Sequence, residues 1–503
     1  MRRSIIITLI LSLIICFSMS MGIQASGGGK LVFAQTIDIL RYDPYDLAIG
    51  NFSMLNTVYD PIVHVNEDFE VEPWLAKSWE FNEDGTELTL VFEEGVLFHS
   101  GREMKAEDVK WTIEQYQDPV NAAIINRAVL LIKEMEVLDD YTLKLKLDKP
   151  YPTIFDILEL LFVVDREGKE DIYNTPAGTG PFKLQKWTPG YTSVYVRNED
   201  YWKEGEPYLD EFVVRVFPDQ QAMTAALEAG TVDIVMYPTV QDFDRLKDNP
   251  NFVAYLAYGC CETNINFNTQ NEPWNDKRVR QAMNHAIDRQ RLADIGFQGN
   301  TYPIVQPIRT GWAHNPDITV DDEGKYDLDL AKQLLVEAGY ADGFKMEALV
   351  SSSVMPESTI LAQIMKNDLA KLNIEVEILD LEQTAYNNMG DKSLYKDMYI
   401  QVVGRTNKDP GSLFSLTVAF RPETNVAQFR DEEYERLVVE GLQTVNQEER
   451  VRIYHRLAEI VVDEAFSLVA VPRPELYLLS LKVDGFQLNR DGFLLSSFLK
   501  EKE

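Results

Sequence analysis

The pattern of apolar and polar positions predicts alternating strands and helices in two separate regions of the chain. In the first region, residues 212–216 alternate in polarity as a strand does, and residues 232–236 form a second apolar strand. Between them Asp219 can cap a helix that Gly230 ends. The apolar stripe of this helix comprises Ala222, Met223, Ala226 and Leu227. The short joints predict a parallel pair of strands with a right-handed crossover.

A second region of the same kind lies further along the chain. Asp327 can cap a helix that ends at Gly339, and residues 344–350 follow as a strand. A helix over 356–372 has a proline in its first turn, and residues 374–378 alternate as the next strand. Two α/β regions separated in sequence predict two lobes, with small ligands bound in the crevice at the carboxyl ends of the strands.

The stretch over 66–175 has a different pattern. Strand-like runs at 87–92 and 142–147 occur together with helical patterns at 105–115 and 154–161. We therefore predict an inserted α+β subdomain.

The N-terminus has the pattern of an export signal. Arg2 and Arg3 precede a nearly continuous apolar run over 5–21, and small residues follow it. The run is shorter than the roughly 20 residues that a membrane span needs, and no basic stop signal follows. We expect cleavage after Ala25, so that residues 1–25 form a signal peptide and the mature protein is periplasmic.

The cysteines bear on location and on metal binding. Cys16 allows an alternative, a lipid anchor at the outer face of the cell membrane, but the bulky Ile15 departs from the small residue that lipid attachment needs. Only Cys260 and Cys261 remain in the mature chain, and a bond between neighbours would close a strained ring. We expect two thiols embedded in a strand, and this pair alone does not make a metal site.

Composition and missing motifs exclude several classes of function. The chain has 503 residues and 45% hydrophobic residues, which is typical of a globular protein with two or three lobes. Its formal net charge of -33 argues against nucleic-acid binding, because phosphates need a basic surface. No phosphate loop, nucleophile elbow or His-Glu-x-x-His occurs, and the five histidines show no ligand spacing. The sequence therefore predicts no catalytic residue, metal or cofactor.

Three ordered groups of motifs resemble a known family. The first group is PWLAKSWE at 73–80, DGT at 84–86, FHSG at 98–101 and KAEDV at 105–109; the second is GTGPF at 178–182 and RNEDYW at 197–202; the third is NINFN at 264–268, KRVRQA at 277–282 and AIDR at 286–289. They resemble the family-5 extracellular solute-binding proteins, which include dipeptide- and oligopeptide-binding receptors of ABC importers. The resemblance extends from about residue 30 to the C-terminus.

The resemblance implies an α/β protein with the two-lobed periplasmic-binding-protein type II fold and an extra α+β subdomain inserted in the first lobe. The implied division is lobe I at 30–60, 180–258 and 473–503, the inserted subdomain at 61–179, and lobe III at 259–472. We expect structural roles for the motifs themselves. Gly178 to Phe182 needs the flexibility of glycine beside a bend fixed by proline, and Asp108 resembles a capping or ion-pair residue.

The resemblance also implies a ligand site. In relatives that hold free dipeptides, an acidic residue binds the ligand amine in a loop ending Asp-Pro, and an arginine binds the ligand carboxylate. The matching loop here is 404–410, with Thr406 at the position of the acid and Ser352 near that of the arginine. Both charged anchors are absent, which favours a ligand held through its backbone or a neutral solute. The implied site comprises Gly404, Arg405, Thr406, Asn407, Asp409, Asn425 and Ser352, and Arg405 could instead contact an anionic ligand.

The function implied by the resemblance is the substrate-binding component of an ABC importer. A monomer without enzymatic activity would close around an oligopeptide-like solute and deliver it to a membrane permease. The alternative is a receptor of the same fold for an oligosaccharide or another non-peptide solute, because aromatic rings can stack on sugars. The candidate rings are Trp111, Trp187, Trp274 and Trp312. An exported hydrolase lacks a visible nucleophile and base, and the scattered histidines argue against a metal-chelate receptor.

Overall fold

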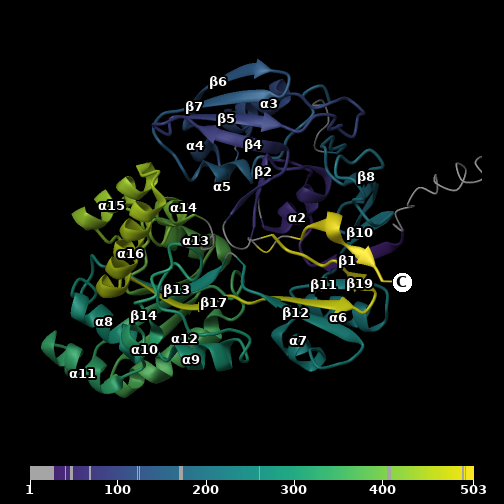
Figure 1. Ribbon diagram of the computed structural model, residues 1–503. Coiled ribbons are helices and arrows are strands. Elements are labelled where there is room, and N and C mark those ends of the chain that lie inside the picture. Colours follow the sequence, from purple (N-terminus) through teal and green to yellow (C-terminus); the bar gives the residue numbers. More distant parts are fainter. Residues whose placement is uncertain are drawn as a thin grey trace, which may run out of the picture.

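Three bodies make up the computed structural model, and each is built around its own β-sheet (Figure 1). We call the body around the seven-stranded sheet lobe I, the body around the five-stranded sheet lobe III, and the body around the four-stranded sheet the inserted subdomain. The described residues are 28–39, 41–45, 49–66, 70–121, 123, 125–168, 174–259, 261–404, 409–489, 492 and 494–502. Two α/β lobes with an α+β insertion are confirmed.

The sheet of lobe I is assembled from segments that are far apart in the sequence. In spatial order its strands are β12 (Phe252–Ala257), β18 (Glu475–Ser480), β11 (Ile234–Met236), β1 (Lys30–Gln35), β10 (Glu211–Val216), β9 (Thr192–Arg197) and β8 (Phe182–Thr188), and β19 (Val483–Asp484) pairs with β20 (Lys500–Glu501). Helix α2 (Ile49–Val58) packs on one face, and α6 (Gln220–Glu228) and α7 (Val240–Leu246) pack on the other. Asp219 caps α6 as predicted, since its carboxylate accepts from the amide of Ala222 at 2.8 Å.

The predicted pairing of strands in lobe I is wrong in one respect. β10 and β11 do run parallel, but β1 lies between them and is hydrogen-bonded to both. A local pattern of polarity shows which residues form a strand but not which strand lies beside it. The crossover through α6 therefore skips one position, which the N-terminal strand fills.

Lobe III has a sheet covered by helices on both faces. In spatial order its strands are β15 (Glu375–Asp380), β14 (Lys345–Val350), β16 (Met398–Val403), β13 (Glu262–Phe267) and β17 (Ser467–Pro472). One face carries α8 (Lys277–Ala286), α9 (Arg289–Arg291), α11 (Leu328–Glu337) and α12 (Ser358–Leu369). The other carries α13 (Gln383–Asp391), α14 (Pro410–Leu416), α15 (Glu432–Gln443) and α16 (Gln447–Glu464), while α10 (Val320–Glu323) packs against α16.

The second predicted α/β unit is confirmed in lobe III. β14 and β15 pair in parallel, and α12 connects them. Asp327 caps α11 by accepting from the amides of Asp329 and Leu330. Helix α12 begins at Ser358, however, so Pro356 lies in the turn before the helix and not in its first turn.

The inserted subdomain is the α+β unit that the pattern predicts. Its strands follow the spatial order β4 (Ala76–Phe81), β5 (Glu87–Phe92), β7 (Thr142–Leu147) and β6 (Ile132–Asp139). Its helices are α3 (Ala106–Gln117), α4 (Asn126–Val129) and α5 (Ile154–Leu158), and the hairpin of β2 (Val63–Val65) and β3 (Val71–Pro73) lies at its base. Helix α5 is shorter than predicted. The chain after it is extended and Phe162 bridges to Pro61, because a short apolar run suits a buried strand as well as a helix.

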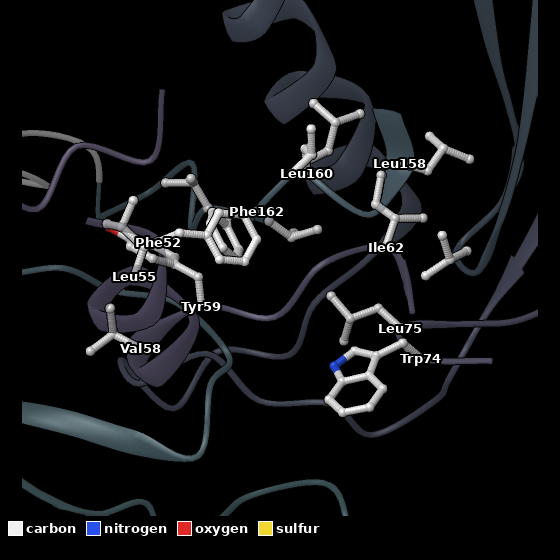
Figure 2. Packing of buried hydrophobic residues seen from close by; sticks show 14 of the residues in the cluster. Phe52, Leu55, Val58, Tyr59, Ile62, Trp74, Leu75, Leu158, Leu160 and Phe162 are labelled. Atoms are coloured by element: carbon white, nitrogen blue, oxygen red, sulfur yellow. The ribbon is translucent and has the colours of Figure 1, made fainter. Parts of the chain in front are cut away.

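Lobe I and the inserted subdomain share one hydrophobic core. Figure 2 shows Phe52 and Tyr59, in and just after α2, against Phe162, with Leu158 of α5 and Trp74 of the subdomain nearby. The rings of Phe52 and Phe162 lie 5.1 Å apart. The cores of lobe III form separate clusters. Continuous packing of this kind makes lobe I and the subdomain one packing unit, whereas lobe III has cores of its own.

The GTGPF motif allows two segments of backbone to approach each other closely. A Cβ on Gly178 would lie 2.1 Å from the carbonyl oxygen of Val58, and one on Gly180 would lie 2.5 Å from the carbonyl carbon of Val58. Neither glycine is among the residues with positive φ. The expectation of glycine flexibility is therefore corrected: the motif needs the missing side chain, not an unusual backbone conformation.

Replacing Gly180 with alanine is expected to lower the free energy of unfolding by about 1–3 kcal/mol, because the backbone of Val58 and Tyr59 must shift. Chemical denaturation of the two proteins measures the difference. Gly28→Ala is the matched control, since its Cβ would lie 3.4 Å from the nearest atom, a side-chain oxygen of Asp210. Equal effects of the two substitutions would refute the close-approach explanation.

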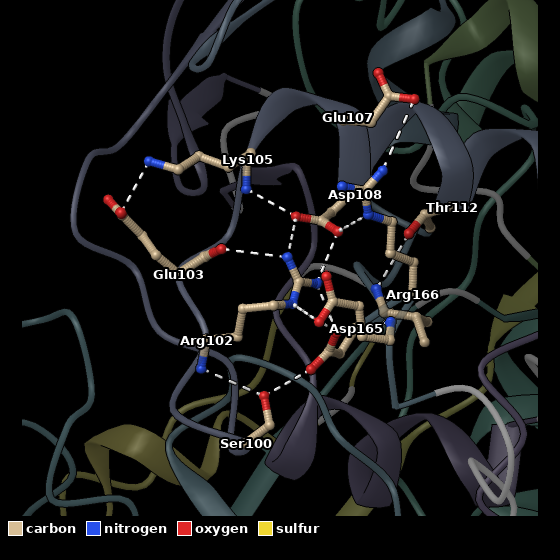
Figure 3. Close-up of polar contacts among 11 residues, drawn as sticks. Ser100, Arg102, Glu103, Lys105, Glu107, Asp108, Thr112, Asp165 and Arg166 are labelled. Atoms are coloured by element: carbon tan, nitrogen blue, oxygen red, sulfur yellow. Dashed lines mark hydrogen bonds and ion pairs between the residues drawn. The ribbon is translucent and has the colours of Figure 1, made fainter.

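The FHSG and KAEDV motifs meet in a buried ion-pair network (Figure 3). Asp108 accepts from Arg102 Nη2 at 2.7 Å and Nη1 at 2.9 Å, and its Oδ1 lies 3.1 Å from Arg166 Nε. It also accepts from the amide of Lys105 at 2.9 Å, which closes the first turn of α3. Arg102 reaches on to Asp165. Asp108 therefore acts both as a cap and as an ion-pair residue, as the resemblance implies.

Candidate functional site

The chain passes between the lobes twice, at matching edges of the two sheets. β12 of lobe I leads into β13 of lobe III, and β17 of lobe III leads back into β18 of lobe I. The two crossings lie side by side, since the amide of Arg473 donates to the carbonyl of Cys261 at 2.9 Å. The parallel strands β1, β10 and β11 and the parallel strands β14, β15 and β16 all end toward these crossings. The carboxyl edges that bind ligands in α/β proteins therefore border one region.

A buried glutamate and a buried arginine lie at the first crossing. Arg309 Nη2 donates to the carbonyl of Gly259 at 2.8 Å and to that of Tyr258 at 3.3 Å. Its Nε lies 3.7 Å from Oε2 of Glu262, the first residue of β13. Burial raises the pKa of the Glu262 carboxyl to about 8, and the Arg309 charge opposes only part of this shift. Within the described chain, neither oxygen of Glu262 has a hydrogen-bond partner.

A cavity of about 850 Å³ lies between the inserted subdomain and lobe III, at the carboxyl end of β16. The subdomain contributes Ile125, Ala128, Asp156, Ile157 and Leu160. Lobe III contributes Val402, Val403, Gly404, Ser412, Ser415, Leu416, Thr417, Val418, Arg421, Pro422, Glu423, Thr424, Glu435, Val438, Val439 and Leu442. The volume suits a small-molecule site, and an occupant would contact both bodies.

The walls of this cavity are mainly apolar. Leu416 is 45% exposed and Val439 is 49% exposed, so both leave apolar surface in contact with water. Covering such surface stabilises a complex by about 25 cal/mol per Å². The polar lining groups include the carboxylate of Asp156 and the hydroxyl of Ser412. A ligand with apolar side chains and a few polar groups would match this lining.

Asp409 connects the two bodies beside the cavity. Its backbone amide donates to Asp156 Oδ2 of the subdomain at 2.9 Å. Its own carboxylate accepts from the amide of Gly411 at 2.8 Å, which caps α14, and pairs with Arg450 of α16. Burial raises the pKa of Asp409, and the guanidinium of Arg450 opposes that shift. A Cβ on Gly411 would lie 2.7 Å from Thr153 of the subdomain, so lobe III and the subdomain pack tightly here.

Residues 70–423 match the family described as bacterial extracellular solute-binding proteins, family 5 Middle. The chain belongs to this family. Its members are substrate-binding components of ABC importers, so the binding role implied by the motifs is confirmed.

The chain is also similar to two curated proteins over most of their length. The family-5 protein is 28% identical over 474 residues to heme-binding protein A of Haemophilus influenzae, covering 87% of this chain and 85% of the relative. It is 26% identical over 543 residues to di/tripeptide-binding protein 1 of Pseudomonas aeruginosa, covering 99% and 98% of the two chains. These relatives match in length as well as in sequence.

A solved structure shares the fold of the family-5 protein. An ABC transporter-associated periplasmic binding protein from Helicobacter pylori, in complex with the peptide STSA, superposes with a TM-score of 0.78 at 26% identity. The match covers 95% of this chain and 99% of that chain. The two-lobed periplasmic-binding-protein type II fold is therefore confirmed. Among the described residues, no helix is long and apolar enough to cross a membrane.

The residues that the resemblance assigned to ligand binding are not all at the cavity. Gly404 lines it, directly after β16. Ser352 follows the neighbouring strand β14, but its amide and hydroxyl both donate to Asp380, at 2.8 Å and 2.7 Å. Asp409 lines a smaller cavity of about 50 Å³ next to the large one. Arg405, Thr406 and Asn407 lie outside the described residues.

Asn425 does not line the cavity, but its side chain supports the backbone of a loop that does. Its side-chain amide donates to the carbonyl of Phe429 at 2.9 Å, and its carbonyl accepts from the amide of Phe429 at 2.8 Å. The same side chain lies within hydrogen-bond distance of the carbonyls of Arg421 and Pro422. Only 2% of Asn425 is exposed. Its position gives it a role in shaping the loop over 421–424, which does line the cavity.

The described residues show no metal centre. No group of three or more histidine, cysteine, aspartate or glutamate side chains is placed to hold a metal ion within them. The ring nitrogens of His99 and His314 each contact a backbone carbonyl, which is typical of a structural histidine. Cys261 is buried but lies one residue before β13, so the expectation of a thiol within a strand is wrong for this residue. Cys260 and Cys16 lie outside the described residues.

Sequence reasoning missed three residues that the fold brings to the junction or the cavity. Asp156 and Ser412 are more than 250 positions apart yet line the same cavity, and Glu262 is buried at the crossing. A carboxylate within a helical pattern is normally solvated, so nothing local marked Asp156. The one available signal for Glu262 was its position as a charged residue at the start of the strand β13.

Proposed function

We propose that this protein is the exported receptor of an ABC importer for oligopeptides with apolar side chains, which it binds without changing them chemically. The observation that carries the proposal is the 850 Å³ cavity with apolar walls between the subdomain and lobe III. Peptide ligands also appear among its relatives, in the di/tripeptide-binding protein and in the complex with STSA. The cavity has apolar walls that suit the side chains of such a peptide and polar groups that suit its backbone and termini.

Closure would couple binding to delivery. The cavity has walls from two bodies, so a ligand contacts both only when they are close together. Ligand contacts that exist only in the closed state shift the equilibrium toward that state. A dissociation constant near 1 μM corresponds to about -8 kcal/mol, which is enough for such a shift. The closed monomer would then dock on a membrane permease.

The oligosaccharide alternative has weaker support from the lining. Trp111, Trp187, Trp274 and Trp312 do not line the large cavity in the part of the chain that the structure describes. Trp274 is fully buried and stacks on Phe267 in the core of lobe III. A sugar site in this family-5 fold would need aromatic faces that are open to the ligand.

Ligand binding is tested by thermal unfolding with a panel of tetrapeptides, oligosaccharides and haem. Apolar tetrapeptides such as Ala-Leu-Leu-Ala are expected to raise the melting temperature. Their binding increases the free energy of unfolding by RT ln(1 + [L]/Kd), which is about 2.7 kcal/mol at 100 times Kd. Mass spectrometry after incubation should recover the peptide intact. Stabilisation by a sugar or by haem but by no peptide would overturn the proposal, and so would peptide cleavage.

We also propose the boundaries and location that the resemblance implied. The division is lobe I at 30–60, 180–258 and 473–503, the inserted subdomain at 61–179, and lobe III at 259–472. The strands of each sheet fall within these limits, which supports the division. Residues 1–25 would be a signal peptide for periplasmic export, with a lipid anchor at Cys16 as the alternative. These residues lie outside the described chain.

A further inference from the structure

One end of the large cavity carries two buried polar groups from different bodies. Asp156, on α5 of the inserted subdomain, is 7% exposed, and Ser412, in α14 of lobe III, is 6% exposed. Both line the cavity. Asp409 is connected to both, because its amide donates to Asp156 and its carboxylate caps the helix that contains Ser412. Asp409 therefore brings the two side chains to the same part of the cavity, whose lining also includes the charged residues Arg421, Glu423 and Glu435.

The hydroxyl of Ser412 points to a missing partner. Its Oγ is buried and has no hydrogen-bond partner among the described residues. A buried hydroxyl without a partner costs about 1–3 kcal/mol, so such groups normally serve a ligand or an ordered water. The neighbouring carboxylate is acceptor-only when it is ionised, which sets the chemistry of a group that would suit both. A donor with a positive charge fits this end, because a carboxylate and a hydroxyl oxygen can both accept from it.

We propose that Asp156, assisted by Ser412, binds the terminal ammonium group of the peptide ligand. The assignment rests on the proposed function, and it specifies which residues bind the charged end of the peptide. In relatives that hold free dipeptides the acid is expected in the loop over 404–410, where this sequence has Thr406. Here the carboxylate would come from the inserted subdomain instead. The peptide would extend from this end along the apolar walls of α15 and β16.

Placing the anchor on the subdomain has a consequence for closure. Gly404 and Ser412 belong to lobe III, while Asp156 belongs to the body that includes lobe I. An ammonium group held by Asp156 and Ser412 together connects the two bodies through one charged contact. That contact exists only when the bodies are close, so it contributes to closed-state affinity and not to the first encounter in the open state.

The experiment compares Ala-Leu-Leu-Ala with its N-acetylated form by calorimetry, in the wild-type protein and in Asp156→Asn. Wild type is expected to bind the free amine about 10–100-fold more tightly, the range for a charge-assisted hydrogen bond. Asp156→Asn is expected to remove this preference. The amide oxygen of asparagine can still accept from the amide of Asp409, so the contact between the bodies is kept. Ser412→Ala is expected to weaken free-amine binding about 2–10-fold.

Glu435→Gln is the matched control, because Glu435 is a half-exposed carboxylate at the rim of the same cavity. It is expected to leave the preference for the free amine intact. A preference that survives Asp156→Asn, that vanishes in Glu435→Gln, or that is absent in wild type overturns the assignment while peptide binding itself stands. No binding of either peptide overturns the proposed function and the assignment together.

Discussion

Replacing Asp108 with alanine is expected to lower the free energy of unfolding by about 3–5 kcal/mol. The substitution leaves two guanidinium groups, those of Arg102 and Arg166, without the fully buried carboxylate that they share. It also removes the acceptor for the amide of Lys105 at the start of α3. The loss combines a broken buried ion pair with a lost helix cap, and the cap alone is worth about 1 kcal/mol. Urea denaturation followed by circular dichroism measures it.

The neighbouring Glu107→Ala is the control for this experiment. Glu107 is a half-exposed carboxylate on the same turn, and it pairs with Lys110 and Arg166 only at 3.9 Å. An exposed pair of this kind contributes about 0–1 kcal/mol. If Asp108→Ala costs no more than Glu107→Ala, the network in Figure 3 does not hold the subdomain together.

The stability of the protein is expected to fall as the pH rises from about 5 to about 8, through the single carboxyl of Glu262. Burial at the crossing raises its pKa from 4.5 to about 8. Between these values the folded protein retains a proton that the unfolded chain has lost. The unfolding free energy then decreases by about 1.4 kcal/mol per pH unit, on the order of 3–5 kcal/mol in total. The contribution is full below pH 4.5 and is lost once the pH exceeds 8.

The Glu262→Gln variant isolates this contribution, because glutamine has nearly the same shape and no titrating group. The difference in unfolding free energy between variant and wild type is expected to increase in favour of the variant from pH 5 to pH 8 and to stay constant above. Glu199→Gln, at an exposed position, is the control and should show a difference that hardly changes with pH. A constant difference for Glu262→Gln would contradict a neutral carboxyl at the crossing.

Much of the local structure followed from the sequence because the signals are short-range. The predicted strands at 87–92 and 142–147 match β5 and β7 residue for residue. Asp219 and Asp327 cap the helices that they were expected to cap. Alternation of polarity and capping both act within a few residues, so they can be recognised without the fold. The family resemblance added the arrangement of lobes and insertion, which periodicity alone did not give.

The candidate site could be predicted only in part. Gly404, assigned to the site through the family resemblance, lines the cavity directly after β16, and its contact with a ligand stays a prediction. Asn425 was expected at the site, yet its amide is taken up by the backbone around Phe429. An asparagine in a loop suits ligand binding and loop support equally well, and only its hydrogen-bond partners tell which role it has.

The sequence by itself determined the α/β class, the family of solute-binding proteins and most strands and caps, because these depend on residues that are close together along the chain. The tertiary structure alone decided that β1 lies between β10 and β11, that Asp156 and Ser412 share one cavity, and that Glu262 is buried beside Arg309. These features depend on contacts between distant segments. Their energies arise from burial and from the loss of water, which no local pattern of residues records.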